Sequence, residues 1–173
     1  MMHKQSLKIV VAWSILILWT SFTAYFSWLK FYKHQGLFSQ QEPTHQLRQA
    51  RVNIEKLIPV FYHFIDEACS CSKFSLPHIE TLMNRYTQVQ HIKVESGDTR
   101  WQSLPWLSDI VASPSVAIFN SGGGLTYFGP YTDGAVCGEG LDLVDIALDK
   151  SKNDPAFQWI NYVSFGCYCP WKT

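Results

Sequence analysis

The sequence predicts an α/β domain, a central mixed sheet flanked by helices, behind an N-terminal transmembrane helix. Three observations predict it. An uncharged apolar run opens the chain, an apolar β-branched run at Leu57–Ile65 is followed by residues at helical spacing, and glycines 122–124 separate two further apolar runs. A parallel strand pair joined by a helix and followed by an antiparallel hairpin is typical of this class. At 173 residues the chain suits one domain with an appendage, because a single core takes about 100–150 residues.

The first element is Ile9–Leu29, an uncharged run between Lys8 and Lys30. About 20 apolar residues cross a bilayer as a helix. A cleavable signal peptide is the alternative, but its apolar part is usually about 7–15 residues long and ends in small residues, whereas this run ends in aromatic ones. We therefore expect an uncleaved signal-anchor at 9–29 after a flank at 1–8. The short N-terminus favours export of the rest of the chain, which would place it in the periplasm on the inner membrane of a bacterium.

The domain proper is expected at 47–152, after a polar linker at 30–46. Apolar spacing predicts its elements: a helix at 47–57, a strand at 57–65, a helix at 74–86 with Pro77 inside it, strands at 91–96, 116–119 and 125–128, a helix broken by Pro105 within 99–110, and a last helix at 141–148. Asp142, Asp145 and Asp149 line one side of that last helix and are expected to form a solvated face. The aromatic, cysteine-containing tail at 153–173 is expected to pack back on the body.

Charge and motifs exclude several classes of partner. Lys plus Arg and Asp plus Glu balance at 14 each, so no global field would attract nucleic acid. Gly122–Gly124 predicts a turn rather than a phosphate-binding loop, because no Lys-Ser/Thr and helix follow it. His78 and His91 are expected at the surface. We expect no bound cofactor.

The order of cysteine and proline residues carries a resemblance. Cys69 ends a predicted strand and opens a helix that has Pro77 eight positions later, and Ser113-Pro114 follows some forty-odd residues after Cys69. In this spacing the stretch from about Arg51 to Lys150 resembles a thioredoxin-fold domain. The whole layout resembles a poorly characterised family of membrane-anchored bacterial thioredoxin-like proteins. The resemblance implies that Cys69 is a nucleophile and that Pro114 is a cis-proline facing it.

The sequence departs from the thioredoxin pattern at three points. The second cysteine of that pattern would fall at Ser72, whereas the sulfur here is at Cys71, and the Trp-Cys-Gly-Pro-Cys signature is absent. The buried carboxylate that carries a proton six residues before the nucleophile is replaced by His63. Two roles remain open for His63: exchanging a proton with the thiol, or filling the core with its ring bonded to the backbone.

The candidate chemistry of the first two cysteines follows from their position. A cysteine at a helix N-terminus has its thiolate favoured by the free backbone N–H groups, which indicates Cys69 as the nucleophile. Cys71 could resolve it in a Cys69–Cys71 disulfide, could be the second ligand of a soft metal, or could be idle. So small a disulfide ring would be easily reduced. Cys137, in the loop after the predicted hairpin, is another candidate resolving thiol, or an idle one.

The tail repeats the one-residue spacing in Cys167 and Cys169. These two could pair with each other, with Cys137, or with the first pair. Five cysteines leave at least one unpaired, and the sequence does not give the connectivity. If both Cys-x-Cys pairs met in space, four thiolates could hold zinc or cuprous ion.

Together these features predict a membrane-tethered thiol–disulfide exchange protein on the extracytoplasmic side. Its partners would be exported cysteine-containing proteins and a membrane thiol reductant or oxidant. The site is expected to comprise Cys69, Cys71, Pro114, His63 and Cys137. Two alternatives are kept: the same fold as a copper(I)-binding and delivery module, and an interaction protein without redox activity.

Overall fold

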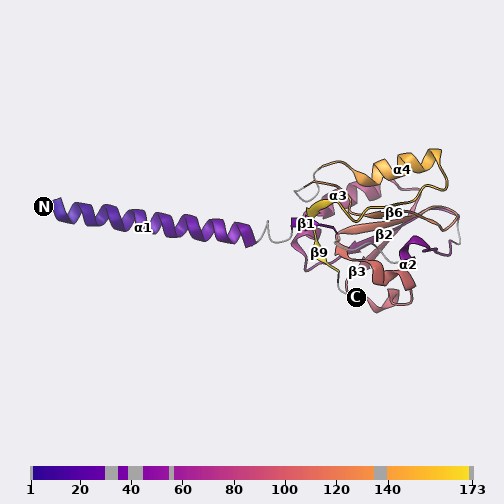
Figure 1. Ribbon diagram of the computed structural model, residues 1–173, viewed down its shortest axis with the longest axis horizontal. Coiled ribbons are helices and arrows are strands. Elements are labelled where there is room, and N and C mark those ends of the chain that lie inside the picture. The colour runs from indigo at the N-terminus through magenta and orange to yellow at the C-terminus, as the bar shows by residue number, and fades with distance from the viewer. Residues whose placement is uncertain (1, 30–34, 39–44, 55–56, 135–139, 172–173) are drawn as a thin grey trace. The chain divides into compact units, whose positions relative to one another are not determined.

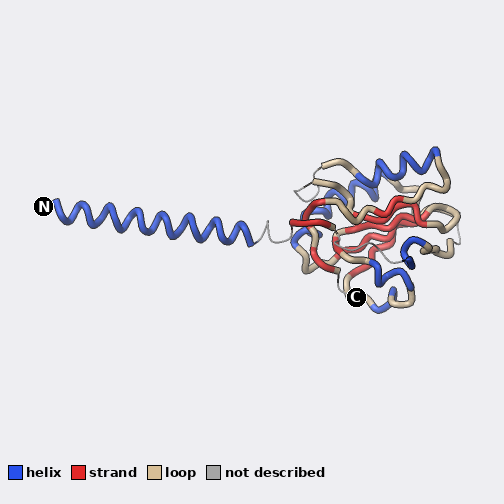
Figure 2. Tube along the Cα trace, viewed as in Figure 1, coloured by secondary structure: helices blue, strands red, loops and turns tan. Residues whose placement is uncertain are grey.

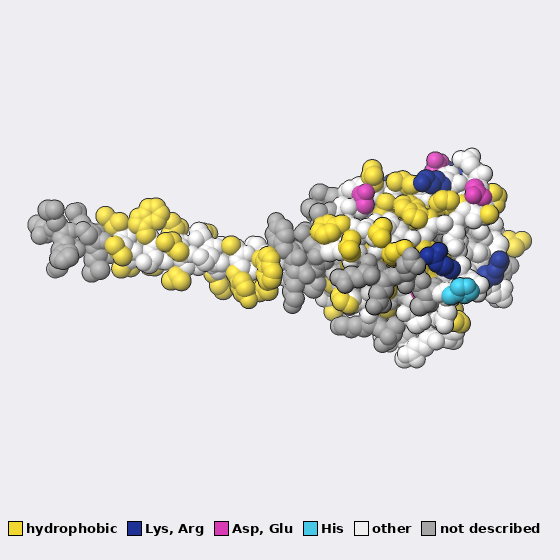
Figure 3. All heavy atoms as spheres, in the orientation of Figure 1, with side chains coloured by type: hydrophobic (Ala, Val, Ile, Leu, Met, Phe, Trp, Pro, Cys, Tyr) yellow, Lys and Arg dark blue, Asp and Glu magenta, His cyan; other side chains and the backbone are white. Residues whose placement is uncertain are grey.

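The computed structural model describes residues 2–29, 35–38, 45–54, 57–134 and 140–171 (Figure 1). The chain divides into two compact units, Met1–His34 and Gln35–Thr173. The first unit holds helix α1 (Met2–Ser27). Within it Lys8–Ser27 is long and apolar enough to cross a membrane, with no residue buried inside the protein. Hydrophobic side chains cover the described length of this helix (Figure 3), as both a membrane anchor and a signal sequence require.

The second unit alternates strands and helices along the chain. Its elements are β1 (Gln35–Leu37), α2 (His45–Arg48), β2 (Val60–Ile65), α3 (Ser70–Arg85), β3 (Gln90–Glu95), the 3-10 helices η2 (Thr99–Trp101) and η3 (Pro105–Asp109), β4 (Ala112–Ser113), β5 (Ser115–Phe119), β6 (Leu125–Gly129), α4 (Leu143–Asn153), β7 (Trp159–Ile160), β8 (Phe165–Cys167) and β9 (Cys169–Pro170).

A five-stranded mixed sheet in the order β3-β2-β5-β6-β7 forms the centre of this unit (Figure 2). Strand β2 pairs in parallel with β3, and α3 connects the two strands. Strand β2 pairs antiparallel with β5, and β5 pairs antiparallel with β6. Strand β7 joins β6 in parallel. The predicted α/β class, with a mixed sheet flanked by helices, is confirmed.

Both faces of the sheet are covered, which explains the unbroken apolar run of β2. Phe61 and Ile65 pack in the core cluster that contains residues of α3 and α4, while Tyr62 and Phe64 pack in the cluster on the opposite face. A strand buried on both sides needs apolar residues at every position rather than at alternate ones. His63 is the one polar residue of this strand, and it is 1% exposed.

The turn between β5 and β6 is fixed by Gly123. Its φ is +78°, and a Cβ added there would collide with the backbone oxygen of Val52. Val52 donates its backbone N–H to the Gly123 carbonyl at 3.0 Å, so the chain before β2 runs close against this turn. The predicted hairpin is confirmed, and its glycine lets the two segments approach.

The predicted helix at 47–57 is wrong beyond its first turn. Helix α2 ends at Arg48, and Arg51 already forms a β-bridge with Gly124. The N–H of Leu47 bonds to the carboxylate of Asp109 at 2.8 Å. The apolar spacing marks buried positions at Leu47 and Ala50, whereas Leu57 is 75% exposed. Long-range pairing with the hairpin turn replaces the helix.

Two other segments also differ from expectation. The predicted linker at 30–46 contains β1, whereas residues 30–34 and 39–44 lie outside the described part of the chain. The predicted helix within 99–110 is the pair η2 and η3, and Pro105 opens the second of them. Proline is favoured at a first helical position, where its missing N–H costs nothing.

The tail packs back on the body as predicted, and it does so as strands. Besides β7 in the central sheet, β8 pairs antiparallel with β1, and β9 pairs antiparallel with β4. Residues 153–173 therefore belong to the same compact unit as the rest of the domain rather than to a separate appendage.

Candidate functional site

Cys69 lies at the junction between β2 and α3. A turn that closes with the Cys69 N–H donating to the Asp66 carbonyl at 3.0 Å carries the chain from the strand to the helix. Cys69 is the N-cap residue of α3, with φ −80° and ψ 123°, and its own side chain makes no capping hydrogen bond. The free N–H groups and the helix dipole would therefore stabilise a thiolate at this position.

The segment before Pro114 faces this helix end. The Ser113-Pro114 peptide bond is cis, as the resemblance implied. The Ser113 carbonyl oxygen lies 3.8 Å from Sγ of Cys69. Pro114 is itself buried. The expected juxtaposition of Cys69 with the proline segment is therefore present in the structure.

The Ser113 hydroxyl ties the two segments together. It accepts the Asp66 N–H at 2.8 Å and lies 2.9 Å from the Ser72 hydroxyl and 3.3 Å from the Phe64 carbonyl oxygen. A hydroxyl has one hydrogen, so if Ser113 donates to the Phe64 carbonyl, Ser72 must donate to Ser113. Ser72, where the thioredoxin pattern has its second cysteine, thus anchors the first turn of α3 to β4.

Four cysteines form a buried cluster of two disulfides. Cys69 is bonded to Cys169, and Cys71 is bonded to Cys167. Their exposed fractions are 3% for Cys69, 0% for Cys71, 8% for Cys167 and 7% for Cys169. The two Cys-x-Cys pairs meet in space, which was one of the open alternatives. The Cys69–Cys71 disulfide considered for Cys71 is not formed, because each of these sulfurs is bonded to the tail.

Backbone and aromatic contacts hold the tail on the cluster besides the disulfides. Cys169 pairs in antiparallel register with Ser113, and the Trp171 N–H donates to the Val111 carbonyl at 3.0 Å. Tyr168, between the two tail cysteines, packs edge-on against Phe38 with ring centroids 5.1 Å apart. The tail therefore lies as a short strand beside the cis-proline segment.

His63 is buried on the face that α3 and α4 cover. Its Nδ1 lies 2.7 Å from the Tyr131 hydroxyl, and its Nε2 lies 2.9 Å from Nδ1 of His91. Burial, together with the nearby His91, lowers the pKa of His63 to about 3. His63 is therefore neutral at physiological pH. Its hydrogen-bond partners are the side chains of Tyr131 and His91. Neither role considered for His63, proton exchange with the thiol or a ring bonded to the backbone, included these partners.

His91 was expected at the surface and is instead part of this chain of rings. It is half-buried, and its Nε2 donates to the Tyr86 carbonyl at 2.9 Å. Tyr131, at the other end, lines a small cavity of about 10 Å³ together with Pro114 and Cys167. The hydrogen-bonded chain thus runs from the wall of the cysteine cluster to strand β3. The parallel register of the structure places His91 beside Phe61, two residues before His63, and no pattern in the sequence fixes that register.

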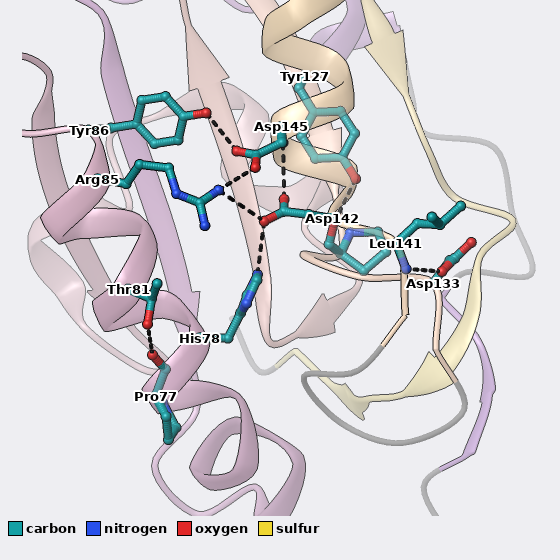
Figure 4. Close-up of polar contacts among 11 residues, drawn as sticks. Pro77, His78, Thr81, Arg85, Tyr86, Tyr127, Asp133, Leu141, Asp142 and Asp145 are labelled. Carbon is teal, nitrogen blue, oxygen red and sulfur yellow. Dashed lines mark hydrogen bonds and ion pairs between the residues drawn. The ribbon is translucent and has the colours of Figure 1, made fainter.

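The remaining predicted residues have other places. Cys137 lies outside the described residues. His78 makes an ion pair with Asp142 at 3.6 Å, if protonated, and Asp145 bonds to Arg85 and Tyr86 (Figure 4). The predicted solvated acidic face is therefore wrong for two of its three members. They join α4 to α3, and Asp149 alone of the three is exposed.

Fold and site together define a mixed α/β domain whose helix-terminal cysteine is held in a disulfide by the chain's own C-terminal strand. The chain belongs to the family described as Domain of unknown function (DUF6436), whose model matches residues 36–171. No curated protein sequence matches the chain.

Several solved structures are similar to this one. A hypothetical protein from Sinorhizobium meliloti has a TM-score of 0.48 and 12% identity, covering 73% of this chain and 82% of that one. An uncharacterized conserved protein from Geobacillus kaustophilus has 0.46 and 13%, covering 80% and 94%. Thioredoxin O2 from Arabidopsis thaliana, in the oxidized state, has 0.39 and 21%, covering 65% and 84%. These TM-scores lie below 0.5, so the likeness does not by itself define the site.

Proposed function

We propose that this protein is a membrane-anchored thiol–disulfide exchange protein with a thioredoxin-like fold, facing the extracytoplasmic side, and that Cys69 is its nucleophile. The observation that carries the proposal is the place of the Cys69 sulfur. It lies at the N-terminus of α3, 3.8 Å from the Ser113 carbonyl oxygen, and it is already half of a disulfide. A helix terminus that stabilises the thiolate makes this sulfur a good leaving group when the disulfide is attacked.

The exchange step involves one sulfur of the partner at a time. The Cys69 thiolate attacks a partner disulfide, a Cys69–partner disulfide forms, and the other partner sulfur leaves as a thiolate that takes up a proton. A second thiolate of this chain then attacks Cys69 and releases the partner. The partner gains two electrons, and this chain gains one disulfide. A membrane thiol reductant would restore the thiols, and an oxidant would drive the cycle in reverse.

His63 and its partners are proposed to carry protons for this cycle. The Tyr86 carbonyl can only accept, so His91 donates to it through Nε2. With Nδ1 of His91 as an acceptor, His63 donates to His91 and Tyr131 donates to His63. When a proton enters at the Tyr131 oxygen, the hydroxyl proton passes to Nδ1 of His63 and the His63 proton passes from Nε2 to Nδ1 of His91, so both bonds of His63 reverse. Such a reversible chain replaces the buried carboxylate that the thioredoxin pattern places here.

The test is reduction of insulin disulfides by the full chain in detergent, with a dithiol as reductant. Cys69→Ser should abolish turnover, because no thiolate remains at the helix end. Cys71→Ser should retain activity, since this sulfur is fully buried and bonded to Cys167. Equal turnover by wild type and Cys69→Ser would refute the assignment of the nucleophile. Absence of turnover in wild type and in all variants, with unchanged binding of a partner, would favour the alternative of an interaction protein without redox activity.

The side of the membrane on which the domain lies is tested separately from its thiol–disulfide exchange activity. Helix α1 meets the length and apolarity of a membrane span. Alkaline phosphatase fused after Thr173, which folds only where disulfides form, should be active if the domain is exported. Replacing two residues in the middle of α1 by arginine should release the fusion from the membrane fraction. A fusion that is produced but inactive would contradict the proposed orientation.

A copper(I)-binding module is the second candidate, favoured by one observation. The sulfur atoms of Cys69, Cys71 and Cys169 all lie within 4.8 Å of one another and are buried. After reduction, three or four thiolates in a dry pocket suit a soft cation such as Cu⁺, and also Zn²⁺. Titrating the reduced full chain with Cu⁺ against a colorimetric chelator tests it. One bound ion per chain, lost in Cys71→Ser and accompanied by no insulin reduction, would favour delivery of metal over exchange.

A further inference from the structure

The C-terminal strand β9 and the segment before Pro114 form a site that the predicted roles do not use. Cys169 is in register with Ser113 and Pro170 with Ala112, so the strand lies antiparallel to β4. The same residue, Cys169, is bonded through its sulfur to Cys69. One backbone pairing thus delivers a cysteine sulfur to the helix-terminal cysteine. Its 100-residue separation from Cys69 in sequence shows that the tail is brought there by its fold, not by proximity in the chain.

Noncovalent contacts hold the tail to the rest of the domain on both sides of Cys169. The N–H of Trp171 bonds to the Val111 carbonyl at 3.0 Å, and the Trp171 ring packs edge-on against Phe64 at 5.5 Å. On the other side, the N–H of Phe38 bonds to the Ser164 carbonyl at 2.8 Å. These contacts would persist when the Cys69–Cys169 bond is broken. They hold an extended, cysteine-containing peptide in place without a covalent bond.

We propose that Cys169 is the resolving cysteine of Cys69, and that strand β9 occupies the position along β4 in which an extended partner peptide lies during exchange. This inference rests on the proposed function and identifies the second thiol that the exchange step requires. It also names the class of partner: a peptide segment in extended conformation that can offer a backbone N–H to Val111 and a cysteine to Cys69. Strand β9 and the partner exclude each other along β4, because that strand edge can pair with one of them at a time.

The cycle balances as follows. A partner peptide displaces β9 from β4 while Cys69 and Cys169 are both thiols, and the Cys69 thiolate attacks the partner's disulfide. The Cys69–partner bond forms, and the leaving partner sulfur takes a proton. When β9 returns, the Cys169 thiolate attacks Sγ of Cys69, the Cys69–Cys169 bond forms, and the second partner sulfur leaves as a thiolate that is protonated. The partner gains two electrons, and a dithiol reductant returns this chain to the start.

The second disulfide serves as a tether in this scheme. Cys71 and Cys167 are bonded two residues before Cys169, and Cys71 is fully buried. While this bond stays closed, Cys169 cannot leave the neighbourhood of Cys69, so its attack is intramolecular. Resolution by Cys169 should therefore be much faster than attack by any thiol from solution.

A trapping experiment tests the assignment of Cys169. The full chain in detergent is reduced only until Cys69–Cys169 is open while Cys71–Cys167 stays closed, as the mass of the alkylated chain verifies. It is then freed of reductant and mixed with a synthetic peptide Phe-Gly-Ser-Tyr-Cys-Pro-Trp whose cysteine is activated as a thionitrobenzoate disulfide. Intact mass then follows the adduct at Cys69. In wild type and Cys137→Ser it should be short-lived, and in Cys169→Ser it should last about 100-fold longer, the typical advantage of an intramolecular partner. A persistent adduct in Cys71→Ser or Cys137→Ser with a short-lived one in Cys169→Ser would overturn the assignment.

Docking along β4 is tested with a matched peptide. Cys169→Ser is allowed to react with the same activated peptide and with one whose last residue is N-methyltryptophan, which lacks the N–H that Val111 accepts. The second peptide should react about fivefold more slowly, the value of one hydrogen bond. Equal rates would overturn the docking of extended peptides on β4. If Cys69 reacts with neither peptide nor with a small aromatic disulfide, the proposed function fails as well, whereas rapid reaction with the small disulfide alone removes only this inference.

Discussion

His63 Nε2 lies 2.9 Å from Nδ1 of His91, and this bond joins two imidazoles across neighbouring parallel strands. The pair is closed at one end by the Tyr86 carbonyl and at the other by the Tyr131 hydroxyl. Every ring nitrogen therefore has a partner, so a buried polar group on an apolar strand keeps its hydrogen bonds. This arrangement explains why β2 tolerates a histidine at its centre.

The first prediction concerns the stability of the folded domain at acidic pH. Burial and His91 lower the pKa of His63 from 6.5 to about 3 in the folded chain, so the unfolded chain binds one more proton between these values. Stability is complete above about pH 6.5 and falls as the pH drops toward 3. The loss at pH 4 should be about 3 kcal/mol. Urea unfolding of wild type and His63→Gln at pH 7 and pH 4 measures it. A pH dependence that His63→Gln leaves unchanged would contradict this source.

The second prediction compares two glycines with the same backbone conformation. Gly97 has φ +80° and nothing within 4 Å of an added Cβ, whereas Gly123 has φ +78° and faces the Val52 carbonyl. Gly97→Ala should cost about 1 kcal/mol, the price of a left-handed backbone alone. Gly123→Ala should cost about 3 kcal/mol, because the segment before β2 must move as well. Equal losses of unfolding free energy for the two variants would mean that the segment before β2 moves away from Gly123 at no energetic cost.

The parts of the fold that the sequence predicted are those with local signals. The apolar run of β2, the helical spacing after Cys69 and the glycines after β5 each specify an element from neighbouring residues. The predicted helix at 47–57 failed after Arg48 because Arg51 and Val52 pair with Gly124 and Gly123 in the hairpin turn, which is distant in sequence. Such a contact leaves no trace in local spacing, and tertiary pairing overrides propensity.

The candidate site was predicted in its first half only. Cys69 and Pro114 could be placed because spacing relates a strand end, a helix start and a proline. The partners of the cysteines could not, because five cysteines allow many pairings and the choice depends on where the tail docks. His91 was missed because Ile92 and Val94 were taken as the inward residues of β3. His91, on the other face of β3, is nevertheless half-buried, whereas Lys93 and Glu95 on that face are exposed.

The third prediction concerns the cap of α4. The Asp142 carboxylate accepts the Asp145 N–H at 3.0 Å and faces His78 of α3 (Figure 4). Asp142→Ala should lower the free energy of unfolding by about 1 kcal/mol, the usual value of an N-cap. Asp149→Ala is the matched control, since this carboxylate is exposed on the same helix and bonds to Lys152 at 3.4 Å. It should change stability by less than about 0.5 kcal/mol. A larger loss for Asp149→Ala would refute the cap as the cause.

The last prediction separates the two disulfides by their effect on stability. Each closes a loop of nearly the whole domain, with sequence separations of 100 and 96 residues. Cross-links over loops of this length typically stabilise by about 2–5 kcal/mol. Because the two loops nearly coincide, the second bond adds little once the first has closed the chain. Cys69→Ser and Cys71→Ser should therefore each lose a small part of the stability.

The double substitution Cys69→Ser with Cys71→Ser should lose most of the 2–5 kcal/mol at once, beyond the sum of the single losses. Urea unfolding of the three variants and wild type, with and without dithiothreitol, measures the difference. Dithiothreitol should bring wild type to the level of the double variant and leave the double variant itself unchanged. Strictly additive single losses would mean that the two bonds restrain different parts of the unfolded chain. The tail would then be held by each disulfide independently, and Cys71–Cys167 would not suffice to keep Cys169 beside Cys69.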